Sequence, residues 1–95
     1  MATKPTRNEI QNMPAGREMD VAIGYHVMDL VAPPELYPDY STDISEAWKV
    51  VEKLHDFDIN RRHVFWLCSF KGKEPMQGDT APLAICRAAL LTVIT

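Results

Sequence analysis

Residues 80–94 have the sequence TAPLAICRAALLTVI and predict a helix that is apolar around almost its whole circumference. Such a helix cannot face water in a soluble monomer, so we expect it to lie buried across a sheet or in an interface. Arg87 is its one charged residue. The guanidinium must reach the helix edge, pair with a carboxylate such as Asp20, or point into a polar pocket, and we favour the ion pair.

The main predicted strand covers residues 63–70 and is apolar on both faces. Val64, Trp66, Cys68 and Phe70 alternate with Phe65 and Leu67, which predicts cover on both sides. Residues 57–59 predict a short strand, residues 60–62 a turn, and residues 75–78 a short edge strand. We therefore predict an α/β (α+β) fold, a three-layer α-β-α sandwich in which helices cover both faces of a small antiparallel sheet of about three strands.

Three further helices are predicted before the sheet. Residues 6–9 have the spacing of a capping box, and the helix they open should end near Met13, because Pro14 restricts the residue before it. Pro14 suits the first turn of an amphipathic helix over about residues 15–30, in which Gly24 suits close packing of a neighbour. The third helix begins within residues 41–43, three residue types that favour N-caps, and Trp48 on its apolar stripe is expected to anchor the core.

Composition limits the class of protein. The 95 residues predict a single domain, residues 1–95, and a formal charge of −3 argues against broad binding to nucleic acid. No apolar run is long enough to span a bilayer, and the polar start lacks the apolar stretch of a signal peptide. We therefore expect a cytoplasmic protein without membrane partners, in which Cys68 and Cys86 are reduced core residues.

The sequence offers no chemistry typical of an enzyme. His26, His55 and His63 are scattered and have no metal-ligand spacing, so we expect no metal. The cysteines lie within apolar patterns, and the glycines form no phosphate-binding loop. We predict a protein that is not an enzyme and uses no cofactor.

Candidate binding residues fall into two groups, a loop with the helix start that follows it and a set of four arginines. The proline-rich loop 32–40 leads into the third helix, whose start offers free N–H groups and hydroxyls beside aromatic rings. Guanidinium groups occur on the predicted turn, near the start of the second helix at Arg17 and on the last helix at Arg87, although a solvated hairpin tip is the simpler explanation for the pair in the turn. The candidate ligand-binding residues are Tyr37, Tyr40, Ser41, Thr42, Asp43, Arg17, Arg61, Arg62 and Arg87.

Three blocks of sequence, residues 13–20, residues 40–54 and residues 80–91, resemble the phage ABA sandwich domain family, a group of small proteins encoded by bacteriophages and prophages. The resemblance implies helix–sheet–helix layering, and a location in the cytoplasm of the infected host. It implies no established activity. The chain departs from the family at residues 21–25, where a more charged and alanine-rich stretch is expected, and this more apolar face is a candidate partner surface.

The phage setting leads to two hypotheses. The first is an anti-defence binding protein that sequesters a nucleotide immune signal, a cyclic nucleotide or an ADP-ribose-type molecule, by stacking its base on an aromatic ring and holding its phosphates with arginine. The alternative is a protein-binding inhibitor of a host defence protein, or a phage accessory or assembly protein without a small ligand. The surplus of apolar helix surface predicts a homo-oligomer in either case.

Overall fold

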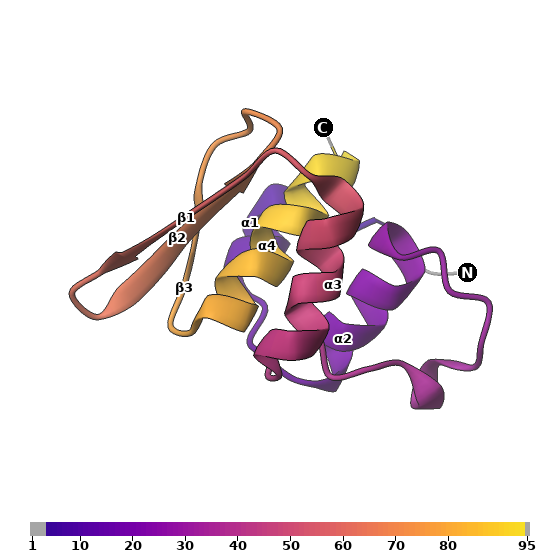
Figure 1. Cartoon of the computed structure of the whole chain (residues 1–95). Coiled ribbons are helices and arrows are strands. Elements are labelled where there is room, and N and C mark those ends of the chain that lie inside the picture. Colours follow the sequence, from indigo (N-terminus) through magenta and orange to yellow (C-terminus); the bar gives the residue numbers. More distant parts are fainter. Residues whose placement is uncertain (1–3, 95) are drawn as a thin grey trace.

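The computed structural model describes residues 4–94 and has four α-helices beside a three-stranded antiparallel sheet (Figure 1). Helices pack against strands on both sides, which confirms the predicted fold class. In chain order the elements are α1 (Arg7–Asn12), α2 (Arg17–Ala22), a π-helical turn (Ile23–Val27), a 3₁₀ turn (Pro34–Leu36), α3 (Ile44–Leu54), β1 (Phe57–Arg62), β2 (Phe65–Phe70), β3 (Met76–Gly78) and α4 (Ala81–Ile94).

Helix α4 is buried along most of its length, as its sequence predicts. It contacts β2 and β3 on one side, and α3 and the π-helical turn on the other (Figure 1). Its apolar side chains therefore meet protein in several directions, which explains why no polar face is needed. The buried residues of α4 are Pro82, Leu83, Ala84, Ile85, Cys86, Ala88, Ala89, Leu90 and Leu91.

The sheet has the strand order β1-β2-β3, and both neighbouring pairs are antiparallel. The prediction of a turn at residues 60–62 is wrong, because β1 continues to Arg62, which pairs with Phe65. Arg61 faces Trp66 across the strands, and its guanidinium lies 5.9 Å from the centre of that ring. Cross-strand pairing of this kind outweighs the local turn preference of the sequence. The turn is at residues 63–64 instead.

The predicted helix over residues 15–30 begins at Arg17 and changes its hydrogen-bonding pattern at Ile23. The N–H of Met28 donates to the carbonyl of Ile23 at 3.0 Å, an i→i−5 bond typical of a π-helix. The residue that follows Met28, Asp29, has a φ of 54°, which ends the helix. Gly24 lies within this π-helical turn and packs closely against the ring of Tyr37. A local sequence pattern cannot reveal such a tertiary contact.

Helix α3 begins where its capping residues predict. The carboxylate of Asp43 accepts a hydrogen bond from the N–H of Ser45 at 2.9 Å, so Asp43 is the N-cap. The prediction that Trp48 anchors the core is wrong, since this side chain is 48% exposed. The buried stripe runs instead through Ala47, Val50, Val51 and Leu54. Relative to the predicted orientation, α3 is therefore rotated about its axis, and Trp48 lies at the edge of the core.

Candidate functional site

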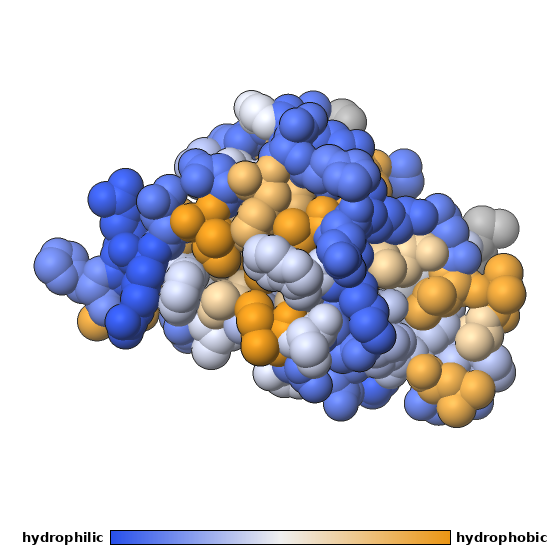
Figure 2. All heavy atoms as spheres, viewed as in Figure 1, coloured by the Kyte–Doolittle hydropathy of each residue, from blue (hydrophilic) through white to orange (hydrophobic). Residues whose placement is uncertain are grey.

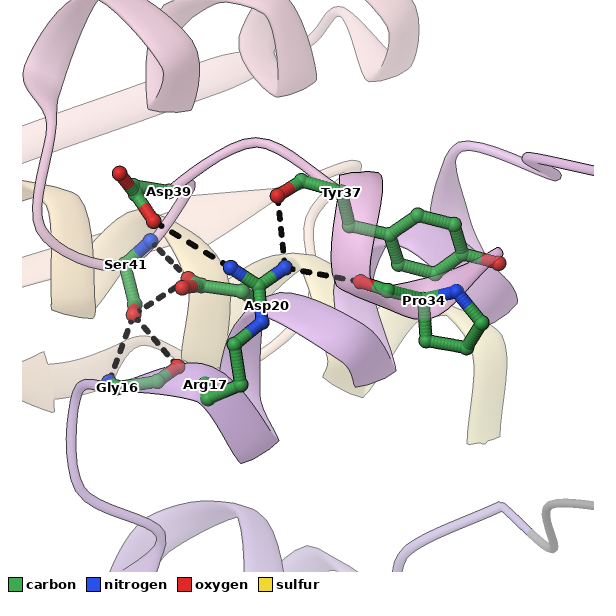
Figure 3. A network of polar contacts seen from close by, with 7 residues as sticks. All are labelled: Gly16, Arg17, Asp20, Pro34, Tyr37, Asp39 and Ser41. Atoms are coloured by element: carbon green, nitrogen blue, oxygen red, sulfur yellow. Dashed lines mark hydrogen bonds and ion pairs between the residues drawn. The ribbon is translucent and has the colours of Figure 1, made fainter. Parts of the chain in front are cut away.

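The loop before α3 is fastened to the start of α2 by a buried carboxylate (Figure 3). Asp20 is 2% exposed and accepts hydrogen bonds from the N–H of Ser41 at 2.8 Å and from its hydroxyl at 2.6 Å. The N–H of Gly16 donates to the same hydroxyl at 2.9 Å. Ser41, a predicted binding residue, is therefore fully occupied in joining two segments of the chain.

Arg17 holds the same loop from the other side. Its guanidinium donates to the carbonyl of Tyr37 at 2.7 Å and to that of Pro34 at 3.1 Å, and it lies 3.4 Å from the carboxylate of Asp39 (Figure 3). These bonds explain how a segment rich in proline, with few backbone donors, keeps one conformation. The structure thus brings Arg17 close to the predicted loop residues, but its donors are directed at two backbone carbonyls and at the Asp39 carboxylate.

The two tyrosines of the loop point into the protein. Tyr37 is 6% exposed, and its hydroxyl donates to the carbonyl of Leu30 at 3.2 Å. Tyr40 is 2% exposed, and burial, followed by the nearby charge of Glu46, raises the pKa of its hydroxyl. A ring that is already covered by protein cannot stack on a ligand in this conformation.

The favoured ion pair between Arg87 and Asp20 is wrong. Arg87 donates to the carbonyl of Met13 at 3.0 Å and to that of Gln77 at 2.6 Å, and burial lowers the pKa of its guanidinium. Asp20 is already satisfied by Ser41, whereas the two carbonyls need donors. Arg87 therefore joins α4 to the α1–α2 connection and to β3.

The remaining predicted residues lie elsewhere on the surface. Thr42 and Asp43 belong to the start of α3, where hydrogen bonds from Ser45 lower the pKa of the Asp43 carboxyl. Arg61 and Arg62 are exposed at the end of the β1–β2 hairpin. The nine predicted residues are thus distributed over several places, and none of them lines either of the two clefts beside the π-helical turn.

Two adjoining clefts open instead beside the π-helical turn. The first has a volume of about 590 Å³ and the second about 200 Å³, and Tyr25 and His26 line both. The two rings meet edge to face with centroids 4.9 Å apart, and Tyr25 is 41% exposed. The other residues of the first cleft are Lys4, Asp29, Leu30 and Val93, and those of the second are Pro5, Met13, Glu18, Val21 and Ala22.

Sequence reasoning did not select this site, although two signals pointed to it. Gly24 interrupts the middle of a predicted helix, and residues 21–25 depart from the expected family pattern. Insertions that widen one helical turn are frequent at functional sites. Small-molecule sites combine aromatic and apolar walls with a few polar groups, and the clefts beside Tyr25 offer this combination.

The first cleft combines groups of both charges. Lys4 brings an ammonium group, His26 an imidazole and Asp29 a carboxylate, while Leu30 and Val93 supply apolar wall. Within residues 4–94 the carboxylate of Asp29 forms an ion pair with Lys53, whose Nζ lies 3.8 Å from it. Such a set can hold an anion at the lysine, a hydroxyl at the carboxylate and a flat ring at Tyr25.

The histidine, cysteine and acidic side chains of residues 4–94 do not gather into a metal-binding cluster. No group of three or more histidine, cysteine or acidic side chains within that range could hold a metal ion. Burial raises the pKa of the Cys68 thiol to about 12 and raises that of Cys86 as well, so neither forms a thiolate near neutral pH. Both cysteines are free and buried, as predicted.

Comparison with known proteins gives one family. The family model described as the phage ABA sandwich domain matches residues 24–90, from the π-helical turn to α4. The first of the three sequence blocks, residues 13–20, lies before this match. No curated protein and no solved structure matches the chain significantly. Among the described helices, none is long and apolar enough to cross a membrane.

Proposed function

The chain belongs to the phage ABA sandwich domain family, and from this premise we propose that it is a non-enzymatic phage protein that sequesters a nucleotide immune signal of the infected host. The proposed ligand is a cyclic nucleotide or an ADP-ribose-type molecule in the host cytoplasm. The cleft beside the π-helical turn carries this proposal, in place of the loop residues selected from the sequence.

The size and lining of the cleft support a ligand of this class. Its volume of about 590 Å³ falls within the usual range of small-molecule sites, roughly 300–1,000 Å³. Tyr25 provides an exposed ring face for a base, which gains about 1–3 kcal/mol by stacking. Lys4 suits a phosphate, a ring N–H of His26 can donate a hydrogen bond to it, and Asp29 suits the hydroxyls of a sugar.

Thermal unfolding with a panel of cyclic and ADP-ribose-type nucleotides tests the proposal. A ligand at about 100 times its Kd adds about 2.7 kcal/mol, which for a domain of this size raises the Tm by roughly 10 °C or more. Tyr25→Ala and Lys4→Ala should each reduce that shift. Lys73→Ala, which removes a lysine outside the cleft, is the matched control and should leave it unchanged.

Two results would count against the nucleotide. If no member of the panel raises the Tm, sequestration of this ligand class is wrong. If a nucleotide binds but Tyr25→Ala and Lys4→Ala bind it as tightly as the unchanged protein, the ligand occupies another site, and the cleft loses its role.

A protein partner is the second candidate function, and a different surface favours it. Val31 is fully exposed and Leu36 is 69% exposed on the loop that Arg17 braces. Two protruding apolar side chains on a stiff loop suit the contact of an inhibitor with a host defence protein, or of an accessory protein with a phage particle. If a protein partner binds here, Val31→Asp and Leu36→Asp should each abolish anti-defence activity. Any nucleotide binding that the unchanged protein shows should be the same in both variants.

A further inference from the structure

Strand β1 has one free edge within the described chain. In the order β1-β2-β3, β2 pairs with one edge of β1, and no described strand pairs with the other. The N–H of Lys71 donates to the carbonyl of Asp56 at 2.9 Å, directly beside the register pair Phe57–Phe70. Because hydrogen-bonded pairs alternate along an antiparallel ladder, the backbone groups of residues 57, 59 and 61 point to the free edge.

The charges on β1 are arranged symmetrically about Asn60. Asp58 and Arg62 are two residues away on either side, so both side chains lie on the same face of the sheet as Asn60. All three side chains are exposed. A two-fold axis through Asn60 would place Asp58 of one copy opposite Arg62 of another, and would do so twice.

We propose that two copies of the chain pair through β1, antiparallel about a two-fold axis at Asn60, to form one sheet that continues across both copies. In this register Ile59 of one copy and the partner's Arg61 exchange backbone hydrogen bonds, because both residues present these groups to the free edge. Asp58 faces the partner's Arg62 in the intervening pair, where opposed side chains lie closest.

Exposed apolar side chains extend this surface beyond the strand. Trp48 packs edge-on against Phe57 with ring centroids 5.6 Å apart, and Ile44 lies one turn before it on α3. They are 48% and 51% exposed. Figure 2 shows apolar side chains gathered between the hairpin and α3. In the proposed register Phe57 faces the partner's His63, so the 82% exposed Val64 of the partner follows beside this apolar area.

The charges also distinguish this pairing from simple protection of an edge. Natural proteins keep edge strands apart with charges that repel a second copy. Here the two charges on one face have opposite sign and attract in the register centred on Asn60. A register centred on Ile59 would instead place Asp58 opposite Asn60, and Arg62 opposite Asp56, which precedes the strand and has a left-handed φ of 47°. Only the register centred on Asn60 therefore pairs the two opposite charges within β1.

Two charge-reversal variants test the pairing. Asp58→Arg gives this face two positive charges, and Arg62→Asp gives it two negative charges. Each variant alone should raise the Kd of the dimer at least about tenfold, because both symmetric pairs become repulsive. An equimolar mixture should dimerise again, since every pair then joins opposite charges. Glu35→Arg, which changes the same charge on a distant loop, is the matched control.

Sedimentation over a concentration series gives the mass, which should change from 10.8 kDa to twice that value as the dimer forms. Circular dichroism of each variant establishes that the monomer is folded. Amide exchange provides a second measurement, because Ile59 and Arg61 should become protected only in the dimer. The proposal is overturned if the unchanged protein stays monomeric, or if its dimer tolerates both single variants. It is also overturned if the mixture fails to dimerise. None of these outcomes depends on the ligand cleft.

Discussion

The ring of Tyr37 lies against the backbone of Gly24, and a Cβ atom at position 24 would be only 2.4 Å from Cδ2 of that ring. Gly24 is therefore required by a contact with the loop, at a site where the helix has become π-helical. Because Arg17 holds the backbone of the same tyrosine, the loop, the start of α2 and the wall of the clefts form one connected unit.

Gly24→Ala should destabilise the protein, although alanine favours helices. The gain in helix propensity is about 1 kcal/mol at most, whereas forcing extra atoms into a packed site costs about 1–3 kcal/mol. Urea unfolding should show a net loss that largely disappears when Tyr37→Ala is the background, because the ring is then absent. A more stable Gly24→Ala protein would contradict the contact.

Asp20→Asn should cost about 1.5–3 kcal/mol, because hydrogen bonds to a buried charged acceptor contribute this much. The amide keeps the shape but replaces the charged acceptor of both Ser41 bonds. Asp39→Asn is the matched control, since the exposed pair with Arg17 should contribute less than about 1 kcal/mol. Equal losses for the two variants in urea unfolding would show that the buried carboxylate has no special role.

Arg87→Met should lower the free energy of unfolding by about 1–3 kcal/mol, because the carbonyls of Met13 and Gln77 lose their donors. Arg87→Lys should recover only part of this, since one ammonium group cannot match a guanidinium that spans two carbonyls. Ligand binding measured on the folded fraction should be unchanged. A variant of full stability that has lost ligand binding would assign Arg87 to the ligand instead.

Cys68 should not react with a thiol reagent in the folded protein at a pH of about 8. Burial raises the pKa of this thiol to about 12, so the reactive thiolate is scarce and also shielded. Both cysteines should react fully once urea unfolds the chain. Rapid labelling of the folded protein would contradict the buried positions of Cys68 and Cys86.

Local patterns of the sequence determined much of the fold. The capping box at residues 6–9, the Asp43 cap and the apolar stretch of residues 81–94 each specify a helix through interactions within a few residues. Alternating side chains likewise specify the strands. These signals are readable because hydrogen bonding and burial act locally along the chain.

Only the tertiary structure decided which partners those elements met. The rotation of α3 exposes Trp48. Gly24 packs against the ring of Tyr37 within the π-helical turn. Asp20 accepts a hydrogen bond from Ser41 instead of pairing with Arg87. The cleft at Tyr25 and His26 depends on these outcomes. Each of these features results from packing between residues that are distant in sequence, so a local sequence pattern cannot predict it.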